Sequence, residues 1–218
     1  MKNIIFIAPP AAGKGTQSKL VSAEYNIPHI STGDLLREEV NSGSDLGVYL
    51  KQEMDKGNLI SDETITTLLK NRLSKSDCAN GYILDGYPRN VTQAKIYENL
   101  LKELNKDLGS VIFLDIDKSL ALERTLSRIV CPNCGASYNL NIESLKPIKE
   151  GICDKCNNTL KIRSDDNKET FLNRFDTYIN NTKELIDYYD KLGVLSRIKI
   201  NKEDSAQDIF NEIKKIII

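Results

Sequence analysis

The chain alternates short apolar runs with longer segments in which apolar residues recur every three or four positions. The apolar runs predict β-strands at residues 3–7, 28–30, 82–85, 110–116 and 196–200. Segments such as 94–104 and 169–192 have the spacing of amphipathic helices, and the tail "IKKIII" predicts the end of a helix packed on the core. This alternation favours an α/β fold, in which a mostly parallel sheet carries helices on both faces.

Two segments interrupt the alternation. Residues 31–60 are polar and helical with glycines between the helical stretches, and residues 128–165 carry four of the cysteines. Both are interpreted as insertions into one core, which is made of residues 1–30, 61–127 and 166–218. A chain of 218 residues with 40% hydrophobic content is long enough for such a core.

Composition narrows the classes of partner. Thirty Lys plus Arg against 31 Asp plus Glu leave a net charge of −1, so a broad basic surface for nucleic acid or anionic membrane is not expected. No run approaches the roughly 18 apolar residues of a membrane span, and we expect no signal peptide. The sequence also has no long exposed apolar stripe. We therefore expect a cytoplasmic monomer without nucleic-acid or membrane partners.

The cysteines form a spaced pattern. Cys78 stands alone, whereas Cys131, Cys134, Cys153 and Cys156 form two C-x-x-C pairs separated by 18 residues. This spacing is typical of a closed tetrahedral zinc site with four thiolates, which has a structural role. An iron centre or two disulfides are the alternatives. A nucleic-acid-binding zinc ribbon is disfavoured because the segment between the pairs has no basic excess.

The stretch "IIFIAPPAAGKGTQ", residues 4–17, predicts a strand, a turn of small residues and a helix. Such a turn presents backbone N–H groups and a helix N-terminus to a polyphosphate, and Lys14 adds a positive charge. The pattern G-x-x-x-x-G-K-[ST] is broken by Ala8 and by Gly15, although Thr16 supplies a hydroxyl at once. An alanine with positive φ would cost about 1–2 kcal/mol here. An ordinary strand-to-helix turn with a surface lysine is the alternative.

Two further motifs support a nucleotide site. "IPHISTGDLLREEV" (27–40) and "YILDGYPRNVTQA" (82–94) each place an arginine, Arg37 or Arg89, shortly after a strand end. Asp85 closes an apolar strand, where a carboxylate can hold a magnesium-bound water. With these motifs the sequence resembles the adenylate kinase family of nucleoside monophosphate kinases, from residue 3 to about residue 200.

The resemblance implies a fold and an activity. The fold is a P-loop NTPase-type parallel five-stranded sheet with an AMP-binding insertion at residues 31–60 and a zinc-ribbon lid at residues 128–165. The activity is reversible phosphoryl transfer from MgATP to AMP, giving two ADP. Gly15 matches the family's loop, G-x-P-G-x-G-K-G-T-Q, whereas Ala8 and Ala11 depart from it. By analogy the lid closes over ATP about hinges near residues 127 and 165.

The resemblance also implies the site residues. For AMP they are Thr32, Arg37, Asn58, Leu59, Ile60, Gly86, Tyr87, Pro88, Arg89, Gln93, Arg163 and Arg174. For ATP they are Ala11, Ala12, Gly13, Lys14, Gly15, Thr16, Arg124, Arg128, Ser137 and Tyr138. Catalysis is assigned to Lys14, Asp85, Arg89, Arg128, Arg163 and Arg174, with Mg²⁺ bound to ATP. Gln93 matches the residue that reads adenine, and Asp165 and Asp166 match carboxylates that pair with the lid-side arginines.

These roles suit the chemistry, because phosphoryl transfer depends on cations placed around two polyanions. Taken singly, each arginine has a simpler interpretation as a solvated surface residue. Gln93 could be a helix-surface amide, and Asp85 could be a helix N-cap or a turn residue. Thr32 and Asp34 could be caps for the helix expected at residues 34–41. His29 is interpreted as a local hydrogen-bonding or packing residue.

Two other functions stay open at this stage. One is a kinase for another nucleoside monophosphate or with GTP as donor. The other is a non-catalytic nucleotide sensor with a degraded phosphate loop. Six retained arginines at family positions speak against the sensor, since a protein without turnover has no evident use for all of them.

Overall fold

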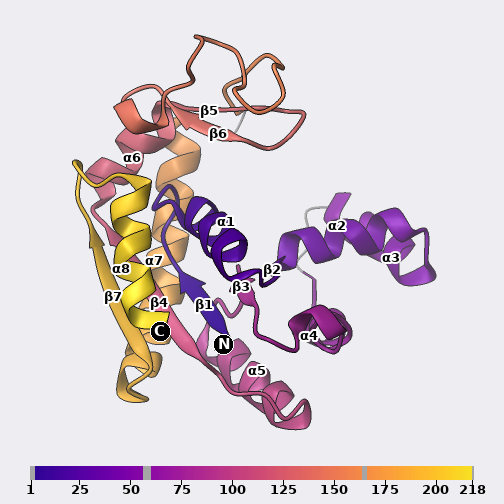
Figure 1. Ribbon diagram of the computed structural model, residues 1–218. Helices are drawn as coiled ribbons and strands as arrows, with labels where there is room; N and C mark the ends of the chain where they lie inside the picture. Colours follow the sequence, from indigo (N-terminus) through magenta and orange to yellow (C-terminus); the bar gives the residue numbers. More distant parts are fainter. Residues whose placement is uncertain (1–2, 56–59, 164–165, 218) are drawn as a thin grey trace.

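The computed structural model describes residues 3–55, 60–163 and 166–217, and its centre is a five-stranded parallel sheet (Figure 1). The strands are β1 (Ile4–Ile7), β2 (His29–Ser31), β3 (Ile83–Asp85), β4 (Ser110–Ile116) and β7 (Leu195–Ile200). Their order across the sheet is β2-β3-β1-β4-β7, and every pair is parallel. The five predicted strands are therefore confirmed.

Helices cover both faces of this sheet, as the alternation of elements predicts. They are α1 (Lys14–Tyr25), α4 (Asp62–Leu73), α5 (Val91–Glu103), α6 (Lys118–Leu126), α7 (Lys168–Lys191) and α8 (Ala206–Ile217). Successive side chains of β1 point to opposite faces, so Ile4 joins a core cluster with α1, α6 and α8, whereas Ile5 joins one with α4 and α5. The long helix α7 contributes to both clusters.

Two parts project from this core in Figure 1. Helices α2 (Thr32–Ser42) and α3 (Asp45–Asp55) form an arm on one side, and the antiparallel ribbon of β5 (Arg128–Val130) and β6 (Ser137–Asn139) lies at the top. Short 3₁₀ turns occupy Ser76–Cys78 (η1) and Glu143–Leu145 (η2). The ribbon has a small cluster of its own, in which Ile129, Tyr138 and Leu160 pack beside the cysteines. Both projections fall in the predicted insertions.

Local capping explains where the helices begin. Ser31 caps α2, because its hydroxyl accepts from the Asp34 N–H, so Thr32 and Asp34 lie inside the helix and are not its caps. Asn90 caps α5 in the same way, which leaves Asp85 at the strand end. The apolar tail forms α8, whose buried face includes Phe210 and Ile213, as predicted. Among the described residues, no helix is long and apolar enough to span a bilayer.

Candidate active site and metal centre

The loop between β1 and α1, residues 8–13, lies at the carboxyl edge of the sheet and is called the phosphate loop below. Ala11 has φ +63° and Gly13 has φ +88°, whereas Ala8 is outside the left-handed region. Gly13 precedes α1 and offers no side-chain cap. The first backbone N–H groups of that helix are therefore not capped by this residue and can donate to a ligand. Of the two alanines that differ from the family's loop pattern, Ala11 therefore has a strained backbone and Ala8 does not.

Asp85, at the end of β3, holds Lys14 from the start of α1. The Lys14 Nζ lies 2.6 Å from Asp85 Oδ1, and His29 Nε2 lies 3.1 Å from Asp85 Oδ2. Burial alone would raise the pKa of the Asp85 carboxyl, but the hydrogen bond to His29 and the charge of Lys14 outweigh it and lower that pKa to about 2. The carboxylate is therefore ionised at neutral pH, beside the phosphate loop.

The turn after β3 joins two predicted site residues through one glycine. The Gly86 carbonyl accepts from Arg89 Nε at 2.8 Å and from Thr32 Oγ1 at 3.4 Å. Gly86 has φ +81°, and a β-carbon there would lie 3.2 Å from the Thr32 hydroxyl. Glycine is thus required both by its backbone conformation and by this close approach. The Tyr87 ring is buried beneath the turn, before Pro88.

Gln93 lies in the first turn of α5, and both the oxygen and the nitrogen of its side-chain amide form hydrogen bonds. Its Oε1 accepts from the Arg89 backbone N–H at 2.8 Å, and its Nε2 donates to Asp62 Oδ1 at 2.7 Å. The residue is 8% exposed, so the interpretation of Gln93 as a helix-surface amide is wrong. Asp62 was missed by the sequence reasoning. It stands 31 residues away in α4, and no local spacing connects the two.

The remaining residues assigned to AMP are more exposed. The Arg37 guanidinium forms an ion pair with Asp34 one turn earlier and lies on the surface of α2. Ile60 is half-buried ahead of α4. Asn58 and Leu59, like Asp165 of the lid, lie outside the described residues. Arg163 and Arg174 are both exposed, the first in the ribbon segment and the second on α7.

Arg128 opens the ribbon and is held by a buried carboxylate. Its Nε donates to Asp166 Oδ2 at 2.8 Å, and its Nη2 contacts the other carboxylate oxygen, which makes the pair bidentate. The Asp166 side chain is 1% exposed. Asp166 therefore pairs with Arg128, an arginine assigned to ATP, whereas the resemblance implied that it pairs with the lid-side arginines. The backbone N–H of Asp166 also donates to the Arg163 carbonyl at 3.1 Å.

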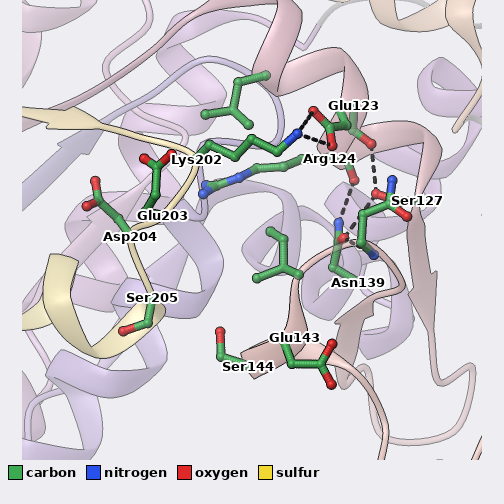
Figure 2. Close-up of a pocket in the computed structure, with 13 residues that line it drawn as sticks. Glu123, Arg124, Ser127, Asn139, Glu143, Ser144, Lys202, Glu203, Asp204 and Ser205 are labelled. Carbon is green, nitrogen blue, oxygen red and sulfur yellow. Dashed lines mark hydrogen bonds and ion pairs between the residues drawn. The ribbon is translucent and has the colours of Figure 1, made fainter.

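Arg124 borders a cavity of about 320 Å³ between α6, the ribbon and the loop that precedes α8 (Figure 2). Figure 2 shows its side chain between Asn139 on one side and the Lys202–Asp204 loop on the other. The Arg124 guanidinium donates to the Asn201 carbonyl at 3.4 Å, and burial lowers its pKa. Lys202 pairs with Glu123 at 3.0 Å on the rim. The cavity thus offers a planar cation on a partly apolar wall.

The four paired cysteines lie together beside the ribbon, two in the β5–β6 turn and two in the segment after β6, as their spacing predicts. Their sulfur atoms all lie within 4.8 Å of one another, with Cys131 to Cys156 at 3.4 Å and Cys134 to Cys153 at 3.5 Å. A zinc–sulfur bond of about 2.3 Å places tetrahedral sulfurs about 3.8 Å apart, so the cluster fits a four-thiolate metal site. All four are free thiols, and disulfides are excluded in this structure because an S–S bond measures about 2.0 Å.

The ribbon also places the two residues assigned to the ATP side of the lid. Ser137 is exposed at the start of β6. Tyr138 is buried. Its hydroxyl lies 3.4 Å from Cys153 Sγ and accepts a hydrogen bond from the Asp154 backbone N–H at 2.8 Å. The Tyr138 side chain therefore supports the cysteine cluster. Cys78, by contrast, is buried in the core beside Arg72.

Comparison with known proteins agrees with this geometry. The family model described as adenylate kinase matches residues 6–194. The adenylate kinase of Geobacillus sp. (strain WCH70) is 42% identical over 215 residues, which cover 99% of this chain and 98% of that protein. The adenylate kinase of Bacillus cereus (strain G9842) is 43% identical with the same coverage. The chain therefore belongs to the adenylate kinase family.

Proposed function

We propose that the protein transfers a phosphoryl group reversibly from MgATP to AMP, giving two ADP. One observation carries the proposal. The Lys14–Asp85 pair lies where the phosphate loop meets β3, with the N-terminus of α1 on one side and Thr32 and Arg89 on the other. Membership of the adenylate kinase family supports the same reaction. No described residue favours a non-catalytic sensor.

On the donor side, we assign the ATP phosphates to the phosphate loop and the start of α1. The residues are Ala11, Ala12, Gly13, Lys14, Gly15 and Thr16. Arg124 would stack on the adenine in the cavity described above, since a guanidinium is a planar cation. Arg128, oriented by Asp166, would hold ATP phosphate, with Ser137 and Tyr138 on the lid side.

On the acceptor side, we assign AMP to the edge formed by α2, the β3–α5 turn and α5. Arg37 and Arg89 would bind the phosphate, because guanidinium forks match phosphate oxygens. Gln93 would read the adenine edge, with Asn58, Leu59 and Ile60 lining the base. Arg163 and Arg174 would close over the transferring group. Charge stabilisation and alignment of the two nucleotides supply the catalysis, so no general base is needed.

When bound with ATP, Mg²⁺ would supply positive charge that neutralises the phosphates. The ionised Asp85 carboxylate fits a role as acceptor for a magnesium-bound water, since hard oxygen ligands suit this ion. His29 orients Asp85 through the 3.1 Å contact, and Lys14 neutralises it when no nucleotide is present. On binding, the Lys14 ammonium would turn from Asp85 toward phosphate.

We propose zinc as the metal of the cysteine cluster and a division into three domains. The core is 1–30, 61–127 and 166–218, the AMP-binding insertion is 31–60, and the zinc-binding lid is 128–165. The ribbon cluster is too small to fold by burial alone, so the metal would supply that stability. The lid would then move as one body and exclude water from the transferring phosphoryl group.

We also propose that the protein acts as a monomer in the cytoplasm. Free thiols in a four-cysteine cluster suit a reducing compartment. The exposed large apolar side chains of the described residues are spread over α3, α6, the segment after β6, α7 and the residue that follows α7. Sedimentation velocity at micromolar concentration tests the oligomeric state, and a species of twice the chain mass would contradict it.

The activity is tested by ³¹P NMR of purified, zinc-loaded protein mixed with Mg²⁺, ATP and AMP. We expect ADP to appear only when AMP is present, with ATP alone as the control. ADP in the ATP-only sample would indicate hydrolysis, and no ADP in either sample would reject AMP as the acceptor.

A further inference from the structure

We propose that Asp62 is a positioning residue that fixes the orientation of the Gln93 amide and so makes the acceptor site select adenine over hypoxanthine and guanine. The inference rests on the proposed function, in which Gln93 reads the base of the monophosphate. It adds a residue from α4 to the acceptor site and specifies which hydrogen-bond donor and acceptor the base must present to Gln93.

The Gln93 side-chain amide has two hydrogen-bond neighbours, Arg89 and Asp62. The Arg89 backbone N–H can only donate, and it lies 2.8 Å from Oε1. The Asp62 carboxylate, when ionised, can only accept, and it lies 2.7 Å from Nε2. A flipped amide would set its oxygen against the carboxylate and its NH₂ against the Arg89 N–H. The partners therefore dictate one orientation, independently of how the amide atoms are assigned.

The held amide has a limited capacity left for a ligand. Of its two N–H donors one goes to Asp62, and of its two oxygen lone pairs one goes to Arg89. One donor and one acceptor remain. Adenine presents a matching pair, because its N1 accepts and its 6-amino group donates. Hypoxanthine and guanine present N1–H as a donor and O6 as an acceptor, so they need the opposite orientation.

The core fixes the distance between the two side chains. Asp62 lies in the first turn of α4, which Ser61 caps, and Gln93 lies in the first turn of α5, which Asn90 caps. Both helices pack in the same core cluster, α4 through Ile65 and Leu69 and α5 through Ala94 and Tyr97. Because these contacts are buried, neither helix start can move away from the other without a loss of packing. The Gln93 side chain, only 8% exposed, has little room to rotate.

The test is Asp62→Asn, compared with the wild type in kcat and KM for AMP and for IMP. Asparagine can offer either an oxygen or an NH₂ to Gln93, so α4 no longer favours one amide orientation, and only the Arg89 N–H still does. We expect the ratio of kcat/KM for AMP to that for IMP to fall about tenfold, through the KM of the acceptor, since unpaired buried polar groups set such discrimination. The KM for ATP should stay at its wild-type value.

Glu63→Gln is the matched control. It removes the same charge from the same helical turn, but Glu63 is exposed and its neighbour Asp62 keeps the Gln93 contact. We expect Glu63→Gln to keep the wild-type AMP to IMP ratio. If it lowers the ratio as much as Asp62→Asn does, the effect comes from helix charge and the inference is overturned.

Gln93→Leu separates this inference from the proposed function. No phosphorylation of AMP by the wild type would refute the proposed function itself. If Gln93→Leu loses discrimination while Asp62→Asn retains the wild-type ratio, the function stands and the role of Asp62 is overturned. If Gln93→Leu retains the ratio, the base is read elsewhere and the inference is likewise overturned. In support, the Asp62→Asn/Gln93→Leu double variant should discriminate no worse than Gln93→Leu alone.

Discussion

The Lys14 ammonium lies 2.6 Å from the Asp85 carboxylate and links the helix that follows β1 to the end of the neighbouring strand β3. The two strands are in parallel register, with Ile4 opposite Ile83. Their carboxyl ends therefore reach the same edge of the sheet, which is where ligands bind in parallel α/β folds. The stability of the fold at low pH and the phosphoryl-transfer activity are therefore both expected to depend on the Lys14–Asp85 contact.

The first prediction concerns low pH. The folded pKa of Asp85 is about 2, below the value of about 3.9 in an unfolded chain, so the ionised carboxylate stabilises the fold above roughly pH 4. This contribution is lost as the pH falls through 2. The difference in unfolding free energy between wild type and Asp85→Asn should shrink by about 2 kcal/mol from about pH 5 to about pH 2. Urea denaturation measures it, and parallel curves would contradict the prediction.

A second prediction concerns catalysis by Lys14. In Lys14→Met the phosphate loop keeps its backbone N–H groups but loses its charge near the transferring group. ADP formation should fall on the order of 10²–10³-fold in kcat. Lys70→Met, which removes an exposed lysine paired with Glu103 on the surface, serves as the control and should stay close to wild type. Equal rates for both variants would remove Lys14 from the mechanism.

A third prediction concerns the strain at Ala11. Because Ala11 has φ +63°, Ala11→Gly relieves a backbone cost of about 1–2 kcal/mol while adding about 0.5–1 kcal/mol of unfolded-state entropy. The net effect should be a gain of about 0.5–1 kcal/mol in unfolding free energy. Ala8→Gly has no such strain to relieve and should lose stability. The prediction fails if both variants change stability in the same direction.

A fourth prediction concerns the metal. Cys156→Ser breaks the four-thiolate cluster, so the purified variant should lose bound zinc, measured by mass spectrometry of the metal content. Its melting temperature should fall by about 5–10 °C, because the ribbon has few other buried contacts. Cys78→Ser, in the core and away from the cluster, should keep one zinc per chain. Retention of zinc by Cys156→Ser would show that this thiol is not a ligand.

A fifth prediction compares a buried with an exposed ion pair. Asp166 is 1% exposed and bidentate to Arg128, so Asp166→Asn should cost about 2–3 kcal/mol of unfolding free energy. Asp176 lies on α7 and forms an exposed pair with Lys118 of α6, so Asp176→Asn should cost less than about 0.5 kcal/mol. Equal losses in chemical denaturation would mean that burial does not decide the strength of these pairs.

Much of the fold was readable from the sequence because it rests on local patterns. Apolar runs such as residues 110–116 are strands since buried parallel strands need continuous apolar residues. The two C-x-x-C pairs predict a tetrahedral cluster because two adjacent turns supply thiols at fixed separations. The local pattern does not decide which residue caps α2, since Ser31 and Thr32 are adjacent and both can cap. Only the backbone shows that Ser31 does.

The contacts that define the site were decided by the tertiary structure. Lys14 meets Asp85, Arg128 meets Asp166, and Gln93 meets Asp62 across 71, 38 and 31 positions of the chain, as the residue numbers give. No periodicity links such residues, because strand order and helix packing bring them together. Local patterns in the chain specify the helices and strands, the spacing of the paired cysteines and the family motifs. Which carboxylate contacts each cation or amide depends on the packing of the helices on the sheet. Burial of the shared core brings these distant partners together.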